Sequence, residues 1–433
     1  MKTPPFWIRF VGLLSLSVVA ALTHAAGAEG SERTRDYTLI VSGFDWGPAA
    51  NKVVLPLGAS ASEAHASQFQ VTVKRSSSLS DLAPERRAGL RNVVMGYVSD
   101  SEGNRSESGQ YFTLVLSVGP DDALASPMEY IAHRNHWIDY QLTVMDRTTE
   151  RVWDRETRRI RPVVDAFNLD GVYEHDNGQR LTYAYFEPPL HSEKSHPLII
   201  WLHGGGEGGT DPSIPLMANL ASNYATPGIQ LYFEGAYVLV PQTPTFWMQA
   251  QDGEYTRGDR EDIQHEALMG LIRQFVMTHA QVDVNRIYVG GCSNGGYMSL
   301  KLVLEHPDFF AAAFPVALGY HAEFLSDAQI ERIQSVPMWL VHSADDETLS
   351  VHETALPLYK RLLAAGAKSV HFSLYERVVD IRGFFGGDDY WYNGHFSWIY
   401  CHANHCRFDY DGSPVKIEGR PVSIMEWLAA QWR

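Results

Sequence analysis

The spacing of hydrophobic and polar positions changes once along the chain, near residue 165. Before this point, short apolar runs alternate with turn-forming residues, and no stretch repeats at helical spacing. We interpret these runs as strands at residues 37–41, 53–55, 69–73, 93–98, 111–118 and 140–144. Short strands at this spacing predict a β-sandwich of about 110 residues. His133 and His136 lie in a polar connection, where we expect a solvated loop.

After residue 165 the pattern predicts alternating strands and helices. Continuous apolar runs, typical of parallel strands with both faces covered, occur at 196–202, 236–240, 287–289, 336–341 and 370–375. Residues 265–276 carry apolar side chains at a spacing of about 3.6 residues, which predicts a helix with one buried face. Further helices are predicted at 297–305, 351–363 and 424–432. We therefore expect a doubly wound α/β domain behind an all-β one.

The first residues have the layout of a secretory signal peptide. Lys2 and Arg9 make a basic start, residues 10–22 are mostly apolar, and Ala26-Gly27-Ala28 offers small residues for cleavage. The apolar run is short for a membrane span, although an uncleaved anchor is the alternative. No later stretch approaches the length of a membrane helix. The expected boundaries are a signal peptide at 1–28, a sandwich at 33–160 and an α/β domain at 165–433, in a secreted or periplasmic protein.

Composition narrows the possible partners. The chain has 433 residues, of which 45% are apolar, so it can bury the cores of two domains. Its net charge is −16 and no basic cluster follows the signal segment, which excludes nucleic acid as an expected partner. The three cysteines, Cys292, Cys401 and Cys406, are too few for a disulfide scaffold. An oxidising compartment would allow one bridge among them.

The first motif with chemical meaning is Gly291-Cys292-Ser293-Asn294-Gly295, between a predicted strand and a predicted helix. It matches G-x-S-x-G, in which a sharp strand–helix turn holds the serine hydroxyl outward. The flanking glycines are needed because a Cβ there would collide with neighbouring backbone. Ser293 is therefore the candidate nucleophile; the alternative is a tight turn without activity.

The second motif is His203-Gly204-Gly205-Gly206, directly after a predicted strand. Acyl transfer forms an oxyanion, and glycines leave backbone N–H groups free to face it. We expect the oxyanion donors to be Asn294 together with Gly204 or Gly205. A phosphate-binding loop is disfavoured because the motif lacks a lysine and because Glu207 would repel an anion.

The acid and the base should follow in that order. The segment His342-Ser343-Ala344-Asp345-Asp346-Glu347 follows a predicted strand, and one of its carboxylates would orient the base. His395 lies beyond the last predicted strand, after Gly394 and before an aromatic run that would exclude water. We expect its Nδ1–H to face the acid and its Nε2 to face the serine. His402 and His405 follow closely, so His405 remains an alternative base.

On these motifs, the second domain resembles the esterase and prolyl-oligopeptidase-like branches of the α/β-hydrolases. In those families the acid stands four residues after the histidine of an H-G-x-x-D pattern, which implies Asp346. The chain has Ser343 where the family has glycine, which leaves Asp345 open. The first domain, with Phe44-Asp45-Trp46-Gly47-Pro48 between strands, resembles the immunoglobulin-like domain that precedes some bacterial carboxylesterases.

The resemblance implies a serine carboxylesterase that hydrolyses small esters through a Ser-His-Asp triad and an acyl-enzyme, without cofactor or metal. Asn294 stands where the related peptidases carry tyrosine, and no propeller domain is present, which favours esters over peptides. Cys292 and Cys406 are placed as in feruloyl esterases and tannases, which implies a Cys292–Cys406 bridge. That arrangement would make His405 the base, and Cys401–Cys406 is the other pairing.

Other functions share parts of this pattern. One is a prolyl-oligopeptidase-like peptidase; another is a feruloyl, aryl-ester or polyester hydrolase. Trp247 and Trp391 could supply an aromatic wall to the substrate pocket, although each is as well explained by core packing. A non-catalytic binding protein is a further possibility, as is a zinc site. The zinc ligands would be His395, His402, His405 and Cys406.

The first domain offers no nucleophile, base or metal cluster in its sequence. We expect it to serve packing, substrate placement or assembly, including a homo-oligomer formed through this domain. A chain beginning near Asp165 is therefore expected to keep its chemistry on a small ester. The sequence leaves the acyl and alcohol preference open, because loops build the pocket.

Overall fold

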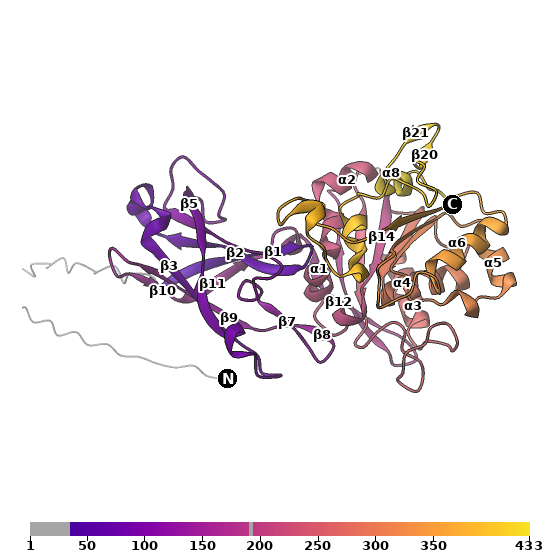
Figure 1. Ribbon diagram of the computed structural model, residues 1–433, viewed down its shortest axis with the longest axis horizontal. Helices are drawn as coiled ribbons and strands as arrows, with labels where there is room; N and C mark the ends of the chain where they lie inside the picture. The colour runs from indigo at the N-terminus through magenta and orange to yellow at the C-terminus, as the bar shows by residue number, and fades with distance from the viewer. Residues whose placement is uncertain (1–34, 190–193) are drawn as a thin grey trace, which may run out of the picture. The chain divides into compact units, whose positions relative to one another are not determined.

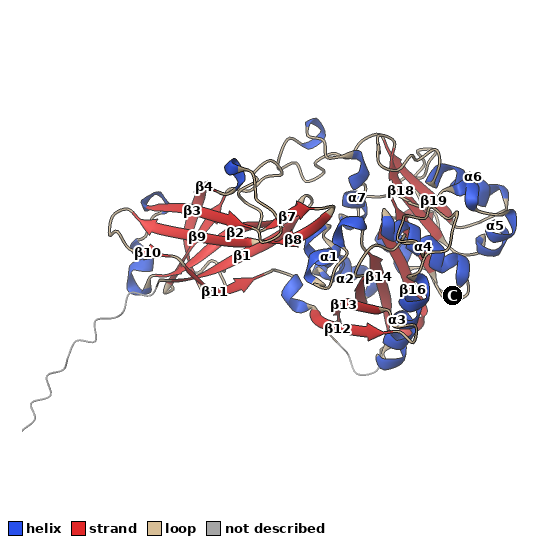
Figure 2. Ribbon diagram, turned by 90° about the horizontal axis from the view of Figure 1, so that it is seen from below, coloured by secondary structure: helices blue, strands red, loops and turns tan. Residues whose placement is uncertain are grey.

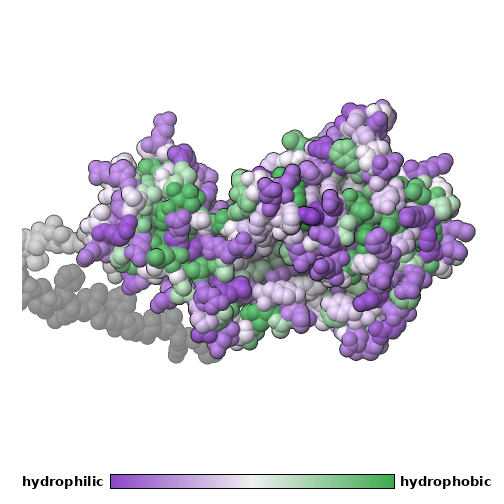
Figure 3. Space-filling view, in the orientation of Figure 1, coloured by the Kyte–Doolittle hydropathy of each residue, from purple (hydrophilic) through white to green (hydrophobic). Residues whose placement is uncertain are grey.

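The computed structural model shows a β-sandwich domain followed by an α/β domain (Figure 1). The described residues are 35–189 and 194–433, so the signal peptide expected at 1–28 lies outside them. None of the helices in these two ranges is long and apolar enough to cross a membrane. On the face shown in Figure 3, hydrophilic and hydrophobic residues are interspersed over the strands of the first domain and over the second.

The first domain is a sandwich of two sheets. The five-stranded sheet has the order β11 (Arg155–Ile160), β1 (Asp36–Phe44), β2 (Gly47–Pro56), β6 (Tyr111–Leu116) and β5 (Val93–Ser99). The four-stranded sheet has the order β10 (Val152–Trp153), β9 (Asp139–Asp146), β3 (Phe69–Ser76) and β4 (Ala88–Arg91). Only β1 and β11 pair in parallel among the strand pairs described in these sheets.

Alternating side chains build the sandwich core. In β3 every second residue from Phe69 is buried, and β9 shows the same alternation from Tyr140. Phe69 packs on Phe112 and Trp153, with ring centroids 5.7 and 6.0 Å apart. This period of two is what places one face of each strand inside and the other outside. Each of the six strands predicted for this domain overlaps a strand of the structure.

The segment expected to be a solvated loop is instead a hairpin. Strands β7 (Met128–Ile131) and β8 (Arg134–Trp137) pair antiparallel in a separate two-stranded sheet. Ala132 and His133 form its turn with positive φ angles of 49° and 66°. The expectation failed because a four-residue strand with polar side chains has no apolar alternation to reveal it.

The second domain contains an eight-stranded sheet with helices on both faces (Figure 2). Its order is β12 (Asn168–Glu174), β13 (Arg180–Phe186), β15 (Tyr237–Gln242), β14 (His196–Leu202), β16 (Val282–Cys292), β17 (Ala312–Val316), β18 (Met338–Ser343) and β19 (Val370–Tyr375). The strands from β15 to β19 in this order run parallel, and β12 and β13 are antiparallel. The doubly wound α/β fold expected from the sequence is confirmed.

Two apolar clusters cover the two faces of this sheet. The first contains the apolar sides of α1 (Ser213–Ala218), α2 (Pro227–Phe233), α7 (Trp398–His402) and α8 (Ile424–Ala429), and it is continuous with the sandwich core. The second contains those of α3 (His265–Thr278), α4 (Asn294–Glu305), α5 (Asp327–Ile333) and α6 (Ala355–Ala364). Because all residues of β14 are buried, its unbroken apolar run was readable in the sequence.

The sandwich contacts the second domain through two of its hairpins. At the β1–β2 turn, Trp46 packs edge-on against Phe385 at 4.8 Å, and Asp45 lies 3.4 Å from the Nε of Arg382. At the β7–β8 hairpin, the Nε1 of Trp137 donates to the Oγ of Ser213 at 2.9 Å. The two hairpins therefore reach loops at the carboxyl edge of the large sheet, where sites of such folds form.

Candidate active site

The serine motif forms a strained turn between a strand and a helix. Ser293 is the single residue between β16 and α4, with φ 55° and ψ −112°. A Cβ on Gly295 would lie 1.9 Å from the carbonyl oxygen of Leu202, and one on Gly291 would lie 2.5 Å from that of Gly295. Only glycine fits at either position. A non-glycine residue held at positive φ in such a turn is the geometry that exposes a nucleophilic hydroxyl.

The His203–Gly206 loop follows β14 and lies beside this turn. A Cβ on Gly205 would lie 3.5 Å from the side-chain nitrogen of Asn294. The Asn294 side chain is buried, and its Oδ1 accepts a hydrogen bond of 2.9 Å from the N–H of Met248. Gly205 and Asn294 are each the first residue of a helical segment, where an N–H group has no acceptor within the helix, and neither donates in a main-chain hydrogen bond described outside the helices and strands. Two free donors on adjacent loops are what an oxyanion site requires.

Gly204 faces a different group. Its position carries no side chain, and a Cβ there would lie 2.9 Å from the Oε2 of Glu207 and 3.6 Å from the Sγ of Cys292. A backbone hydrogen bond from Gly204 lowers the pKa of both groups, against the larger effect of burial. The N–H of Gly204 is therefore directed inward, which leaves Gly205 as the stronger of the two expected donors.

Asp346 and His395 are hydrogen-bonded to each other at the same edge of the sheet. The Nδ1 of His395 lies 2.8 Å from the Oδ2 of Asp346. The Oδ1 of Asp346 accepts from the N–H groups of Thr348 and Leu349 at 2.8 and 2.9 Å. Asp345 is exposed and bonds to Ser343 instead. The structure thus brings His395 to Asp346, and not to its neighbour.

The Asp346 carboxylate is held in its charged form. Burial favours its protonation, but hydrogen bonds from His342 and His395 outweigh burial and keep its pKa well below the ordinary value. The Nε2 of His342 lies 3.1 Å from the same Oδ2 that His395 contacts. A charged acceptor on Nδ1 fixes the tautomer of His395 and leaves its Nε2 free to take a proton.

The His395 loop packs closely. A Cβ on Gly394 would lie 2.5 Å from the carbonyl oxygen of Asp345, so glycine is needed there. The Oδ1 of Asn393 accepts from the N–H of His395 at 2.9 Å, and Trp398 packs edge-on against its ring at 5.6 Å. His405, in contrast, is exposed and lies against Tyr400, and burial together with Arg407 lowers its pKa.

The three cysteines correct the expected disulfide. All of them lie in the described part of the chain, and all are buried free thiols. The Sγ of Cys292 faces the side-chain amide of Asn219 at 3.2 Å, and that of Cys401 faces the hydroxyl of Tyr224 at 3.6 Å. Burial raises the pKa of Cys292 and Cys401 well above the ordinary value, and that of Cys406 to about 12. Neither expected bridge is formed.

The two tryptophans proposed as an aromatic wall have different surroundings. Trp247 has no exposed surface, and its ring packs against His203 with centroids 5.0 Å apart. It therefore belongs to the core, which corrects the pocket assignment. Trp391 is 56% exposed, and the guanidinium of Arg377 lies 4.0 Å above its ring.

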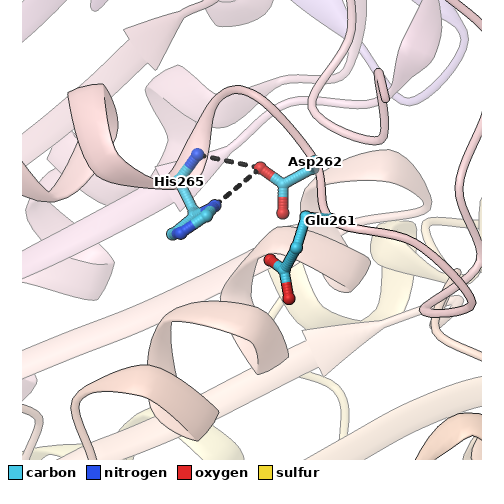
Figure 4. A group of neighbouring side chains, drawn as sticks. All are labelled: Glu261, Asp262 and His265. Carbon is cyan, nitrogen blue, oxygen red and sulfur yellow. Dashed lines mark hydrogen bonds and ion pairs between the residues drawn. The ribbon is translucent and has the colours of Figure 1, made fainter. Parts of the chain in front are cut away.

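A cluster of possible metal ligands occurs elsewhere, at Glu261, Asp262 and His265 (Figure 4). Asp262 accepts from the N–H of His265 at 2.8 Å and so caps helix α3. Glu261 already pairs with a cation, because the Nζ of Lys301 lies 2.7 Å from its carboxylate. The cluster is therefore explained by helix capping and an ion pair. Among the described residues, the four ligands of the alternative zinc site do not converge into such a group.

Sequence reasoning missed one buried carboxyl group at the site. Glu207 is 8% exposed, and its Oε1 accepts from the side-chain amide of Asn135 at 2.9 Å. Its Oε2 accepts from that of Asn219 at 3.3 Å. Burial raises the pKa of Glu207 to about 7, although hydrogen bonds from Asn135 and Gly204 oppose this effect. The only sequence signal was its place directly after the glycine motif, since Asn135 lies in the first domain.

Comparisons with known proteins divide the chain in the same way. Residues 36–157 match the esterase Ig-like N-terminal domain, and residues 247–330 match the prolyl oligopeptidase family. A thermostable esterase of known structure is 25% identical, with a TM-score of 0.72, over 92% of this chain and 99% of that one. A Pyrococcus horikoshii acylaminoacyl peptidase is 16% identical over 61% of this chain and 44% of its own, with a TM-score of 0.40, too low to support a conclusion.

An uncharacterized secreted protein of Arthroderma benhamiae is 24% identical over 251 residues. The match covers 50% of this chain but only 24% of that protein. The two domain matches and the thermostable esterase agree with the architecture seen in the structure. The chain therefore combines a domain that matches the immunoglobulin-like N-terminal domain of esterases with an α/β-hydrolase domain, part of which matches the prolyl oligopeptidase family.

Proposed function

We propose that this protein is a serine carboxylesterase in which Ser293 is the nucleophile, His395 the base and Asp346 the orienting acid. The observation that carries this proposal is the His395–Asp346 hydrogen bond, which lies at the same carboxyl edge of the sheet as the strained, half-buried Ser293. The oxyanion donors are the N–H groups of Gly205 and Asn294. The substrates are small carboxylic esters, and the reaction needs no cofactor.

In the proposed reaction, the Oγ of Ser293 attacks the ester carbonyl carbon while its proton passes to the Nε2 of His395. The resulting oxyanion accepts from Gly205 and Asn294. Collapse of this intermediate breaks the bond to the alcohol, which leaves with the proton from His395. Water then attacks the acyl-enzyme and gives its proton to His395, and the carboxylic acid leaves as Ser293 regains its proton.

A fluorophosphonate probe tests this assignment on the full-length protein. We expect it to label Ser293, with and without a chelator, because the hydroxyl and not a metal is the reactive group. Ser293→Ala should abolish labelling and lower kcat on p-nitrophenyl butyrate by about 10³-fold or more, with an unchanged Tm. A variant that keeps over about a tenth of the wild-type kcat would refute the nucleophile.

The substrate class is decided by comparing p-nitrophenyl esters, feruloyl esters and prolyl amides. The likeness to a thermostable esterase favours esters, so we expect the amides to be the poorest substrates. Cleavage of prolyl amides at a rate above that of the esters would replace the carboxylesterase by a peptidase.

We also propose a secreted or periplasmic location, in keeping with a relative described as a secreted protein. Recovery of the native protein in the cytoplasm, with residues 1–28 retained, would contradict this.

A further inference from the structure

The β7–β8 hairpin of the sandwich lies against the His203–Gly206 loop. A Cβ on Gly206 would lie 3.1 Å from the ring of Tyr130 and 3.4 Å from the side-chain nitrogen of Asn135. These two residues face each other across the hairpin, because Tyr130 pairs with Asn135 in its register. Beside them, Arg134 donates to the carbonyl oxygen of Pro244 at 3.0 Å.

Asn135 reaches the loop through one buried group. Its Nδ2 donates to the Oε1 of Glu207, the residue that follows the glycines. The other carboxylate oxygen of Glu207 faces Asn219 and the backbone of Gly204. The main-chain oxygen of Glu207 also accepts from the Nε2 of Gln242 at 2.9 Å, which fixes the loop to the end of β15.

The same network touches the nucleophile turn. The side-chain amide of Asn219 contacts both Glu207 and the Sγ of Cys292, the residue before Ser293. Through Asn219, the Glu207 carboxylate therefore links Gly204 on the His203–Gly206 loop to Cys292 on the nucleophile turn. Gly205, one of the two expected oxyanion donors, directly follows Gly204 in the sequence. Asn294, the other donor, lies two residues after Cys292.

We propose that Asn135 of the immunoglobulin-like domain is a positioning residue for ester hydrolysis. By holding the Glu207 carboxylate, it keeps the N–H of Gly204 turned inward and that of Gly205 turned toward the oxyanion. This inference rests on the proposed function and deepens it. It concerns the donors rather than the substrate, so it affects turnover and leaves substrate binding unchanged.

Loss of the Asn135 amide leaves one buried carboxylate oxygen without its donor. A buried unpaired acceptor reorients or admits water, and either change releases the loop that it held. Small displacements of oxyanion donors reduce turnover strongly, because their effect depends on distance to the developing charge. Asn135→Ala should therefore lower kcat by about 10-fold or more and change KM by less than about 2-fold.

A matched control is available on the same hairpin. Ser213 accepts from Trp137, the second residue after Asn135, and it lies on α1 rather than on the glycine loop. Ser213→Ala removes a hydrogen bond of equal length between the same two domains, together with the bond from the Ser213 hydroxyl to Asp211. It should lower Tm as Asn135→Ala does, while its kcat stays within about 2-fold of wild type.

Rescue separates positioning from packing. Asn135→Asp places a second carboxyl group beside Glu207, and its kcat should fall as far as that of Asn135→Ala. Adding Glu207→Gln restores an amide–carboxylate pair with the two groups exchanged, and we expect the double variant to recover most of the lost kcat. These two variants decide the question if Asn135→Ala does not fold.

Kinetics on p-nitrophenyl butyrate, with Tm for each full-length variant, distinguish the outcomes. A fall in kcat for Asn135→Ala but not for Ser213→Ala, with rescue in the double variant, supports the positioning role. Three results overturn the positioning role, provided that Ser293→Ala is inactive. They are a wild-type kcat in Asn135→Ala, an equal loss of kcat in Asn135→Ala and Ser213→Ala, and a failure of the double variant to recover kcat. Turnover that survives Ser293→Ala refutes the proposed function and the positioning role together.

Discussion

Replacing Glu207 by glutamine should change how the stability of the protein depends on pH. The carboxyl group is buried, and its hydrogen-bond partners among the described residues are amides and not cations. Burial raises its pKa from 4.5 to about 7. The difference between these two values, at about 1.4 kcal/mol per pKa unit, corresponds to about 3 kcal/mol of unfolding free energy.

The sign follows from the proton count. Below pH 4.5 the group is protonated in both states and makes no difference. Between pH 4.5 and about 7, the unfolded chain loses this proton while the folded protein keeps it, so stability falls as pH rises. Above about pH 7 both states are ionised, and the full cost of the buried charge is present. Glu207→Gln removes this pH-dependent loss.

We therefore expect the free energy of unfolding of Glu207→Gln, relative to wild type, to rise by about 2–3 kcal/mol between pH 5 and pH 8. Urea unfolding at each pH measures it, and any pH-independent effect of the substitution cancels in the comparison. Two neighbours do not titrate in this window, because the pKa of Tyr130 and that of Cys292 are both raised. Glu107→Gln, at an exposed position, controls for the lost charge. Parallel pH curves for Glu207→Gln and wild type would refute the reasoning.

Two further predictions concern the active-site loops. His395→Ala should lower kcat by about 10³-fold or more, whereas His405→Ala should lower it by a modest factor only, because His395 alone of the two contacts Asp346. Steady-state kinetics of both variants measure this difference. An inactive His405→Ala variant beside an active His395→Ala variant would reverse the assignment of the base. Gly295→Ala should yield no folded protein, because its Cβ would lie 1.9 Å from the carbonyl oxygen of Leu202; soluble expression with the wild-type Tm would contradict the packing argument.

The parts of the fold that follow from local rules could be predicted from the sequence. The unbroken apolar runs became buried strands, and the predicted strands at 196–202 and 370–375 have the observed bounds. β17 was missed because its five buried residues include two alanines and a proline, which give little β signal. β12 and β13 were missed because they are antiparallel strands with exposed positions, which lack the unbroken apolar run of the buried parallel strands.

The active-site residues follow the same rule: features set by local contacts could be predicted from the sequence, and features set by distant contacts could not. The Ser293 turn was readable because its glycines are required by contacts within a few residues and with the adjacent strand. The sequence favours His395 over His405 without deciding between them, since both lie in loops and only the fold shows which one meets Asp346. The disulfide implied by resemblance failed for a related reason, because the direction of the Cys292 side chain depends on Asn219, 73 positions earlier in the chain.

The contact between Asn135 and Glu207 joins residues 72 positions apart in different domains, and no motif marks Asn135. The sequence of the first domain contains no reactive group, which predicts a role in packing, substrate placement or assembly. The structure gives it a more direct connection to the reaction, because the Asn135 amide is part of the network behind the glycine loop.

A chain that begins near Asp165 lacks this amide, and it also lacks the sandwich residues that continue the core of the second domain. Its glycine loop would then lose a donor for a buried carboxylate, whatever ester is bound. The sequence predicts that such a chain keeps its chemistry on a small ester, whereas the proposed role of Asn135 predicts that its kcat falls. An effect on the oxyanion donors is common to all acyl groups, whereas an effect on substrate placement would grow with the length of the acyl chain.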